Sequence, residues 1–383
     1  MLLKSLIFAG ALQGLFLVLL LRAKKPKPLA DQWLMAWLIL VSIQLFFYLD
    51  SLSIKPVATN FCGIIAFSIP LLTAPILFQY ILSISSGKAP HLKTVAFYVV
   101  PWLIYVILTT ATGLTYHNGI TVRYGFPHFT AIVPKLLIYL FTMPIAVIPG
   151  LYALKGLLVL NRYRKSLPDK YSYTEKINLN WLKWLVISIL GLFVLLFLFI
   201  RFGRQQQLAG TENLFAYVGA TLALYVFFIG YMGLQQQSAI EKDSNTAKLE
   251  QPAAYQKTGL DEISSAQLYS SLLNYMEEEK PYLNDELNLA MLAQQIGINA
   301  NQLSQIINQQ STKNFFVFVN GYRVEAVKVK LLDPQFSHLS ILGIAYESGF
   351  RSKSAFNRIF KTQTGLTPLE YQKQNNLGTS PAL

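Results

Sequence analysis

The segment from Gly349 to Tyr371 holds the residues with the most chemical information in this 383-residue chain. A glycine, and then a serine suited to cap a helix, precede the helical pattern Lys353–Lys361, and a closing turn follows it. This order is typical of the second half of a helix-turn-helix. The segment therefore indicates double-stranded DNA as a partner.

The chain offers few residues for catalysis. Its four histidines lie at 91, 117, 128 and 338, and none has the neighbours of an H-E-x-x-H or H-x-x-E-H zinc motif. The sequence also has no P-loop, no G-x-S-x-G and no G-x-G-x-x-G. We therefore predict no enzyme activity, no metal and no cofactor. The alternative is a transporter or membrane enzyme with a helical regulatory or protein-interaction tail.

The pattern ahead of the helix occurs twice. An apolar–alanine pair is followed by a glycine, an apolar residue, an Asn or Ser cap and a helix. The members are Ala293, Gly297, Asn299 and 301–309 in the first copy, and Ala345, Gly349, Ser352 and 353–361 in the second. Alanine lets two helices cross closely, and glycine adopts the unusual backbone angles of the turn. Two copies offset by 52 residues (345 − 293 and 349 − 297) predict two helix-turn-helix units.

A further helix is predicted between the two units. Apolar residues recur at helical spacing from Phe315 to Leu332, and eighteen residues of helix would be about 27 Å long. That length is close to the roughly 34 Å between successive major-groove faces on one side of B-DNA. A helix of this length could hold two DNA-reading units about one turn apart.

Residues 283–375 resemble the AraC/XylS-type DNA-binding domain, in which a linker helix joins two helix-turn-helix units. The residues that carry the resemblance are Arg323-Val-Glu-Ala326, Leu331-Leu332, Ile344-Ala345, Gly349-Phe350, Phe356-Asn-Arg358, Phe360-Lys361 and Thr364-Gly-Leu-Thr-Pro-Leu-Glu-Tyr371. With the apolar stretches ahead of it, the whole chain is similar to membrane-bound regulators of this family found in bacteria. The resemblance implies a sequence-specific transcription regulator.

The resemblance also implies base-edge contacts from the exposed early positions of each second helix. These are Lys353, Ser354, Asn357 and Arg358 in the C-terminal unit, and Asn301, Gln302, Ser304 and Gln305 in the N-terminal unit. Arginine commonly reads guanine and asparagine reads adenine, whereas Arg351, Lys361 and Thr364 would contact phosphates. The N-terminal unit departs from the family pattern, which usually has basic residues at the positions of Gln305 and Asn308. Structural support is therefore the other interpretation of that unit.

Seven apolar stretches precede this domain, and each is about long enough to span a membrane. They cover approximately 5–21, 33–54, 61–86, 94–113, 132–160, 181–200 and 213–234. Loops on alternate sides carry eleven and four Lys/Arg residues, which places the N-terminus outside and the chain after residue 234 in the cytoplasm. We predict an all-α protein with a seven-helix transmembrane bundle in the bacterial inner membrane.

Charge is distributed unevenly along the chain. Residues 1–240 hold 19 Lys/Arg against 5 Asp/Glu, whereas residues 241–383 hold 13 against 14. We predict a membrane domain at 1–234, a linker at 235–282, a DNA-binding domain at 283–375 and a disordered tail at 376–383. The linker contains an amphipathic helix, 260–280, whose apolar stripe must pack on its own domain or on a second copy of the chain. The second arrangement would give a homodimer.

The signal that such a regulator would receive is not identified by the sequence. The predicted outer loop 114–131 contains His117, Arg123 and His128, which with neighbouring aromatic residues could form a ligand-binding or pH-sensing patch. Anchoring at the membrane surface is the alternative. Asp50 lies in an apolar stretch, where a carboxylate is a functional candidate. A position among the outer lipid headgroups is the simpler interpretation of Asp50.

Overall fold

The computed structural model describes most of the chain. The described residues are 2–24, 29–52, 65, 67–86, 92–115, 120–123, 126–129, 135–175, 177–198, 211–235 and 262–377. They form two compact units, the first made of Met1–Arg162 with Leu179–Glu241 and the second of Tyr163–Asn178 with Lys242–Leu383. The short segment Tyr163–Asn178 thus belongs with the C-terminal part of the chain, although it lies between two apolar helices in sequence.

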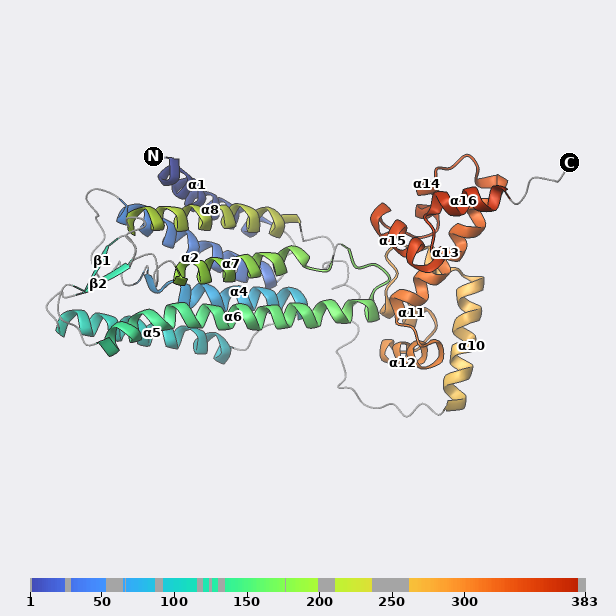
Figure 1. Ribbon diagram of the computed structural model, residues 1–383. Helices are drawn as coiled ribbons and strands as arrows, with labels where there is room; N and C mark the ends of the chain where they lie inside the picture. The colour runs from blue at the N-terminus through green and yellow to red at the C-terminus, as the bar shows by residue number, and fades with distance from the viewer. Residues whose placement is uncertain are drawn as a thin grey trace. The chain divides into compact units, whose positions relative to one another are not determined.

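The described part of the first unit consists of apolar helices and one β-hairpin (Figure 1). The elements are α1 (Leu2–Ala23), α2 (Leu29–Ser51), α4 (Pro70–Ser86), α5 (Leu92–Thr115), β1 (Ile120–Arg123), β2 (Phe126–Phe129), α6 (Lys135–Lys170), α7 (Asn180–Leu198) and α8 (Thr211–Gln235). The last turns of α6, from Tyr163 onward, lie in the second unit. Each of these helices falls on one of the seven predicted apolar stretches.

The described apolar helices differ in the length of their apolar stretch. Among the described residues, three helical stretches are long and apolar enough to cross a membrane, namely Leu2–Ala23, Leu29–Asp50 and Met143–Lys170. Four further apolar stretches are shorter: Pro70–Ser86, Ala96–Thr112, Asn180–Leu195 and Ala216–Met232. The count of seven spans therefore stays a prediction.

Small residues allow α1 to pack closely on α8 and on α2. A Cβ atom added to Gly10 would lie 2.3 Å from Cβ of Ala223, and one added to Gly14 would lie 2.2 Å from Oγ of Ser42. Glycines four residues apart lie on nearly the same face of a helix, and such pairs bring apolar helices together in membranes.

Among the described residues, the prediction of an all-α chain is confirmed except for one pair of short strands. Strand β1 pairs antiparallel with β2, so that Ile120 lies opposite Phe129 and Arg123 opposite Phe126. Three successive β-branched residues in β1 (Ile120, Thr121, Val122) favour an extended backbone. A strand of four residues is too short to stand out from a loop in the sequence.

The second unit is helical apart from its connections. Its elements are α10 (Glu262–Glu278), η2 (Pro281–Leu283), α11 (Leu289–Gln295), α12 (Ala300–Ser311), α13 (Phe315–Leu332), η3 (Pro334–Phe336), α14 (Ile341–Glu347), α15 (Lys353–Thr364) and α16 (Pro368–Leu377). The central helix α13 has the predicted bounds. It contributes Phe318 to one apolar core with α11 and α12, and Val327 to another core with α14 and α15. The predicted pair of helix-turn-helix units joined by a linker helix is thus present.

The local chemistry of the repeat matches its sequence pattern. The side chain of Asn299 accepts a hydrogen bond from the backbone N–H of Gln302, and Ser352 accepts one from Ala355. Gly349 has φ +85°, and a Cβ atom added there would lie 2.2 Å from the carbonyl oxygen of Tyr282. Only glycine therefore fits the second turn without strain.

The amphipathic helix of the predicted linker packs on its own domain. Leu272 and Met276 of α10 are 1% and 0% exposed, and they belong to the apolar core that includes Phe318. Residues 236–261 of the linker lie outside the described residues. The last helix, α16, continues to Leu377, two residues beyond the predicted end of the domain, and the remaining residues 378–383 are also outside the described part.

Candidate nucleic-acid interface

The exposed face of α15 displays the polar residues that the sequence singled out in the C-terminal unit. Phe356, Ile359 and Phe360 form the buried stripe of this helix. The opposite side exposes Lys353, Ser354, Asn357 and Arg358. The Arg358 side chain is 61% exposed. An amphipathic helix of twelve residues with donors and acceptors on its free side has the form needed to enter a DNA major groove.

The three predicted phosphate contacts differ in their surroundings. Lys361 is exposed on the last turn of α15. Arg351, which precedes the helix, lies 3.3 Å from a carboxylate oxygen of Glu286 through Nη2. The Thr364 hydroxyl donates to the carbonyl of Phe360 at 2.8 Å and so takes part in closing the helix. Of the three, Lys361 is the residue with the freest approach to a phosphate.

The corresponding helix α12 presents fewer free groups. Asn301 is exposed, whereas Gln302, Ser304 and Gln305 are partly buried. The Gln302 amide oxygen accepts from the backbone N–H of Asn299 at 3.2 Å, which completes a capping box. Gln302 therefore helps to start α12. That contact favours the interpretation of the N-terminal unit as structural support. Base contacts by this unit stay a prediction.

A buried arginine lies in the linker helix α13. Arg323 of α13 is 1% exposed, and its guanidinium donates to the carbonyls of Tyr282 and Asn284 at 2.8 Å each. Burial lowers the pKa of Arg323 to about 10, opposed by the charge of Asp285. The group is therefore charged at neutral pH. Arg323 belongs to the motif that carried the family resemblance, and here it binds η2 and the following turn to the linker helix.

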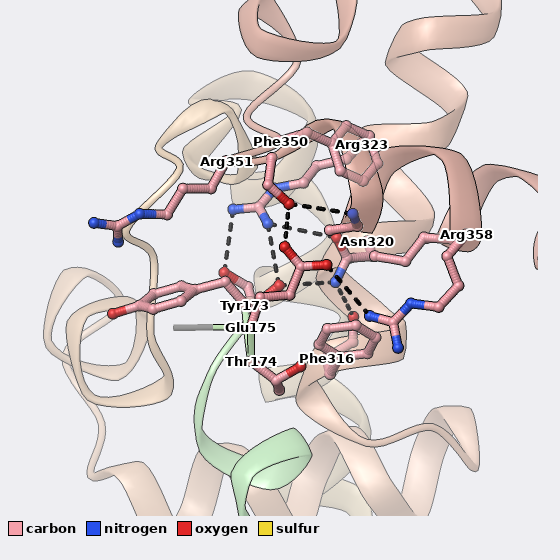
Figure 2. A pocket seen from close by; sticks show the side chains of 13 residues that line it. Tyr173, Thr174, Glu175, Phe316, Asn320, Arg323, Phe350, Arg351 and Arg358 are labelled. Atoms are coloured by element: carbon pink, nitrogen blue, oxygen red, sulfur yellow. Dashed lines mark hydrogen bonds and ion pairs between the residues drawn. The ribbon is translucent and has the colours of Figure 1, made fainter. Parts of the chain in front are cut away.

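The segment between α6 and α7 supplies contacts that the sequence interpretation missed. Ser172 is 2% exposed, and its carbonyl accepts from Asn320 at 2.9 Å and from Arg323 at 3.3 Å. Glu175 accepts hydrogen bonds from the hydroxyls of Ser352 and Ser354. Figure 2 shows the Glu175 carboxylate turned toward the Arg358 side chain, with a separation of 3.9 Å between Oε1 and Nη2. A glutamate in a basic loop was the signal of this contact in the sequence.

Two of the four candidate sensing residues, Arg123 and His128, lie in the paired strands β1 and β2. The backbone of His128 lies opposite Thr121 in the hairpin, and Arg123 ends β1. His117 lies outside the described residues. Asp50 lies in the last turn of α2, on a different element. A sensing patch formed by these four residues stays a prediction.

No group of three His, Cys, Asp or Glu side chains suited to hold a metal ion occurs among the described residues. The polar groups that converge in the second unit are guanidinium, amide, hydroxyl and carboxylate groups. They suit hydrogen bonding and ion pairing with another surface.

Comparison with known proteins supports the assignment of the C-terminal region. Residues 292–374 match a family described as a helix-turn-helix domain. The chain is 34% identical over 104 residues to the uncharacterized HTH-type transcriptional regulator YpdC of Escherichia coli (strain K12), which covers 27% of this chain and 34% of YpdC. An uncharacterized HTH-type transcriptional regulator of Staphylococcus aureus (strain COL) is 30% identical over 102 residues, 27% of this chain and 13% of that protein. The chain thus spans only a minor part of the length of both relatives.

One solved structure is also similar in sequence. A protein of unknown function from Listeria innocua is 31% identical, and the match covers 27% of this chain and 94% of that chain with a TM-score of 0.25.

Proposed function

We propose that this protein is a membrane-embedded transcription regulator that binds promoter DNA sequence-specifically through its two helix-turn-helix units. The observation that carries the proposal is the exposed face of α15, on which Lys353, Ser354, Asn357 and Arg358 stand opposite a buried aromatic stripe. Such a face combines base-reading groups with positive charge. The similarity to proteins named HTH-type transcriptional regulators supports the same function.

The two helix-turn-helix units are proposed to contribute unequally to DNA binding. In the C-terminal unit, Arg358 and Asn357 would read bases, while Lys361 would neutralise a phosphate. In the N-terminal unit, Asn301 is the exposed candidate for a base contact, because Gln302 already caps its own helix. The interface would therefore owe most of its salt dependence to the C-terminal unit.

The first unit is proposed to lie in the bacterial inner membrane, with the N-terminus outside and the DNA-binding domain in the cytoplasm. Three observations support this location: three helical stretches among the described residues that are long and apolar enough to cross a membrane, the surplus of Lys/Arg in alternate loops of the sequence, and large apolar side chains that are exposed. Leu19, Ile107 and Leu195 are 63%, 64% and 66% exposed, as side chains that face lipid would be. We propose 1–234 as a membrane domain that receives an unidentified signal and 283–375 as the DNA-binding domain.

Selection of DNA by the full chain would test the function. The protein, reconstituted in lipid nanodiscs, is incubated with a library of random 40-base-pair duplexes, and bound duplexes are sequenced after several rounds. We expect enrichment of a bipartite motif with half-sites about one helical turn apart. Binding without enrichment of any motif would contradict sequence-specific recognition, and retention of no DNA at all would contradict the proposed function as a whole.

A further inference from the structure

Helix α15 of the C-terminal unit is in contact with the segment Tyr171–Glu175, which follows α6 directly. This segment belongs to the same compact unit as the helix-turn-helix pair, so the contact lies within one folded body. Glu175 accepts from Ser354 Oγ at 3.3 Å and from the Ser352 hydroxyl, and its carboxylate approaches Arg358 to 3.9 Å. Two of these three partners are groups that we propose to read DNA bases.

The other end of the segment is anchored in the domain. The Ser172 backbone N–H donates to the carbonyl of Leu287 at 3.4 Å, and its hydroxyl accepts from Arg323 at 3.1 Å. Its carbonyl accepts from Asn320 at 2.9 Å. With Ser172 only 2% exposed, these bonds are shielded from water. The position of the segment is thus fixed by hydrogen bonds to the loop residue Leu287, to α13 and to the start of α15, and not only by one ion pair.

An aromatic residue completes the overlap with the proposed DNA-binding face. The guanidinium of Arg351 lies 4.9 Å from the ring centroid of Tyr173. Arg351 is one of the predicted phosphate contacts. Stacking on Tyr173 therefore engages a cation that DNA would otherwise use.

The chemistry of the segment resembles that of the ligand it would displace. A carboxylate, like a phosphate or a guanine edge, presents hydrogen-bond acceptor atoms to serine hydroxyls and to an arginine fork. Because Ser354, Arg358 and Arg351 cannot bind both partners at once, the two partners exclude each other. We propose that Tyr171–Glu175 is an intramolecular competitor of DNA, and that the protein binds its promoter tightly only after Glu175 leaves α15. This inference rests on the proposed function.

The segment Tyr171–Glu175 is covalently connected to the proposed membrane domain through α6. It continues α6, whose apolar part belongs to the first unit. A signal that shifts or rotates α6 would therefore act on Glu175 through the covalent chain. No separate messenger protein is required.

Removal of the Glu175 charge gives the sharpest test. The variant Glu175→Gln keeps the side-chain shape, and the matched control Asp169→Asn removes an exposed carboxylate from the last turn of α6. Both variants change the net charge by the same amount, so non-specific attraction to DNA rises equally in both. Full chains in nanodiscs are titrated with the duplex enriched from the random library, and selections are run with the wild-type chain and with Glu175→Gln.

We expect Glu175→Gln to bind the enriched duplex about tenfold more tightly than the wild type, and Asp169→Asn to change the affinity by less than about twofold. Equal affinities of the two variants for the enriched duplex would overturn the competition while leaving the proposed function intact. Failure of the wild type and of Glu175→Gln to select any duplex would overturn the proposed function itself.

A second measurement reports on the position of the segment. The chain contains a single cysteine, Cys62, which is replaced by serine, and spin labels are attached at Thr174→Cys and at Val329→Cys on the exposed side of α13. The distance distribution between the labels should change when the enriched duplex is added in excess. An unchanged distribution in the DNA-bound chain would mean that the segment stays on α15, and the proposal would be wrong.

Discussion

Replacement of Arg323 by methionine should destabilise the DNA-binding domain without touching its DNA-facing surface. Methionine has a similar stem and no charge, so it removes the guanidinium fork alone. Arg323 donates at 2.8 Å to the carbonyls of Tyr282 and Asn284. In the variant the Ser172 carbonyl still accepts from Asn320, and Asn284 is exposed and can bind water. Tyr282 is 9% exposed, so its carbonyl is the acceptor at greatest risk of being left without a donor.

The magnitude follows from two opposing effects. Hydrogen bonds to a charged donor contribute about 1.5–3 kcal/mol each, and a buried acceptor without a partner costs about 1–3 kcal/mol. Methionine also removes the cost of burying a charge, which the lowered pKa of Arg323 puts on the order of 3 kcal/mol. The lost hydrogen bonds exceed this gain. We expect Arg323→Met to lower the free energy of opening of the domain by about 2–4 kcal/mol.

Native-state hydrogen exchange of the full chain in nanodiscs measures this quantity, because the protein has two units and a single melting temperature would mix them. Peptides from α13 should exchange roughly 30- to 1000-fold faster in Arg323→Met. The control is Lys328→Met on the same helix, where an ion pair with Glu325 at 2.9 Å is exposed and should contribute less than about 1 kcal/mol. Equal exchange in the two variants would show that desolvation of Arg323 cancels its hydrogen bonds, contrary to this reasoning.

Three further expectations concern binding, the turn and pH. Arg358→Ala should lower specific DNA affinity by about 1–3 kcal/mol and relax one base-pair preference, whereas Lys361→Ala should weaken all duplexes alike and reduce the salt slope by about one, as fluorescence anisotropy can measure. Gly349→Ala should destabilise the domain by about 3 kcal/mol or more, because Gly349 has φ +85° and an added Cβ atom would lie 2.2 Å from a backbone oxygen. Gly321→Ala, where an added Cβ atom would meet nothing within 4 Å, should change stability by less than about 1 kcal/mol. Hydrogen exchange measures both changes. Hydrogen bonds with Thr367 lower the pKa of Glu370. The contribution of Glu370 to stability is therefore present above about pH 4.5 and is lost as the pH falls through the folded-state pKa. In Glu370→Gln, the protection of α16 against hydrogen exchange should no longer show this loss at acidic pH.

The helix-turn-helix pair could be predicted because its determinants are local. The caps Asn299 and Ser352, the glycines of the turns and the apolar spacing of α13 each act within a few residues, and each was found where the sequence placed it. The exposed positions of α15 were expected from the family resemblance. Local rules of this kind depend little on the rest of the fold.

The contact of Tyr171–Glu175 could not be predicted for the opposite reason. Its partners lie between 115 residues away, for Leu287 and Ser172, and 183 residues away, for Arg358 and Glu175 (358 − 175). The segment is too short and too polar to show a periodicity, and one glutamate in a basic loop is unremarkable by composition. The burial of Arg323 was likewise invisible, because arginines are mostly exposed. Pairing over such distances appears only in the folded chain.

The two ends of the segment differ in burial, and this difference determines how release would occur. Ser172 is 2% exposed and supplies acceptors to Arg323, so its departure would leave a buried charge short of partners. The Glu175 side chain is 30% exposed, and its ion pair with Arg358 is long. Release of Glu175 alone should therefore cost far less than release of the whole segment, on the order of 2–3 kcal/mol for two hydroxyl bonds and one rim ion pair.

That cost lies within the range of ordinary coupling between two sites, about 1–3 kcal/mol. A movement of α6 that biases the Glu175 contact by this amount would change the fraction of available α15 helices by one to two orders of magnitude. Because the competitor is part of the same chain, it acts at a high effective concentration, and weak contacts are enough to hold it. A stronger contact would resist promoter DNA, whose base contacts are worth about 1–3 kcal/mol each. The exposed, modest contact of Glu175 suits a switch better than a fully buried ion pair would.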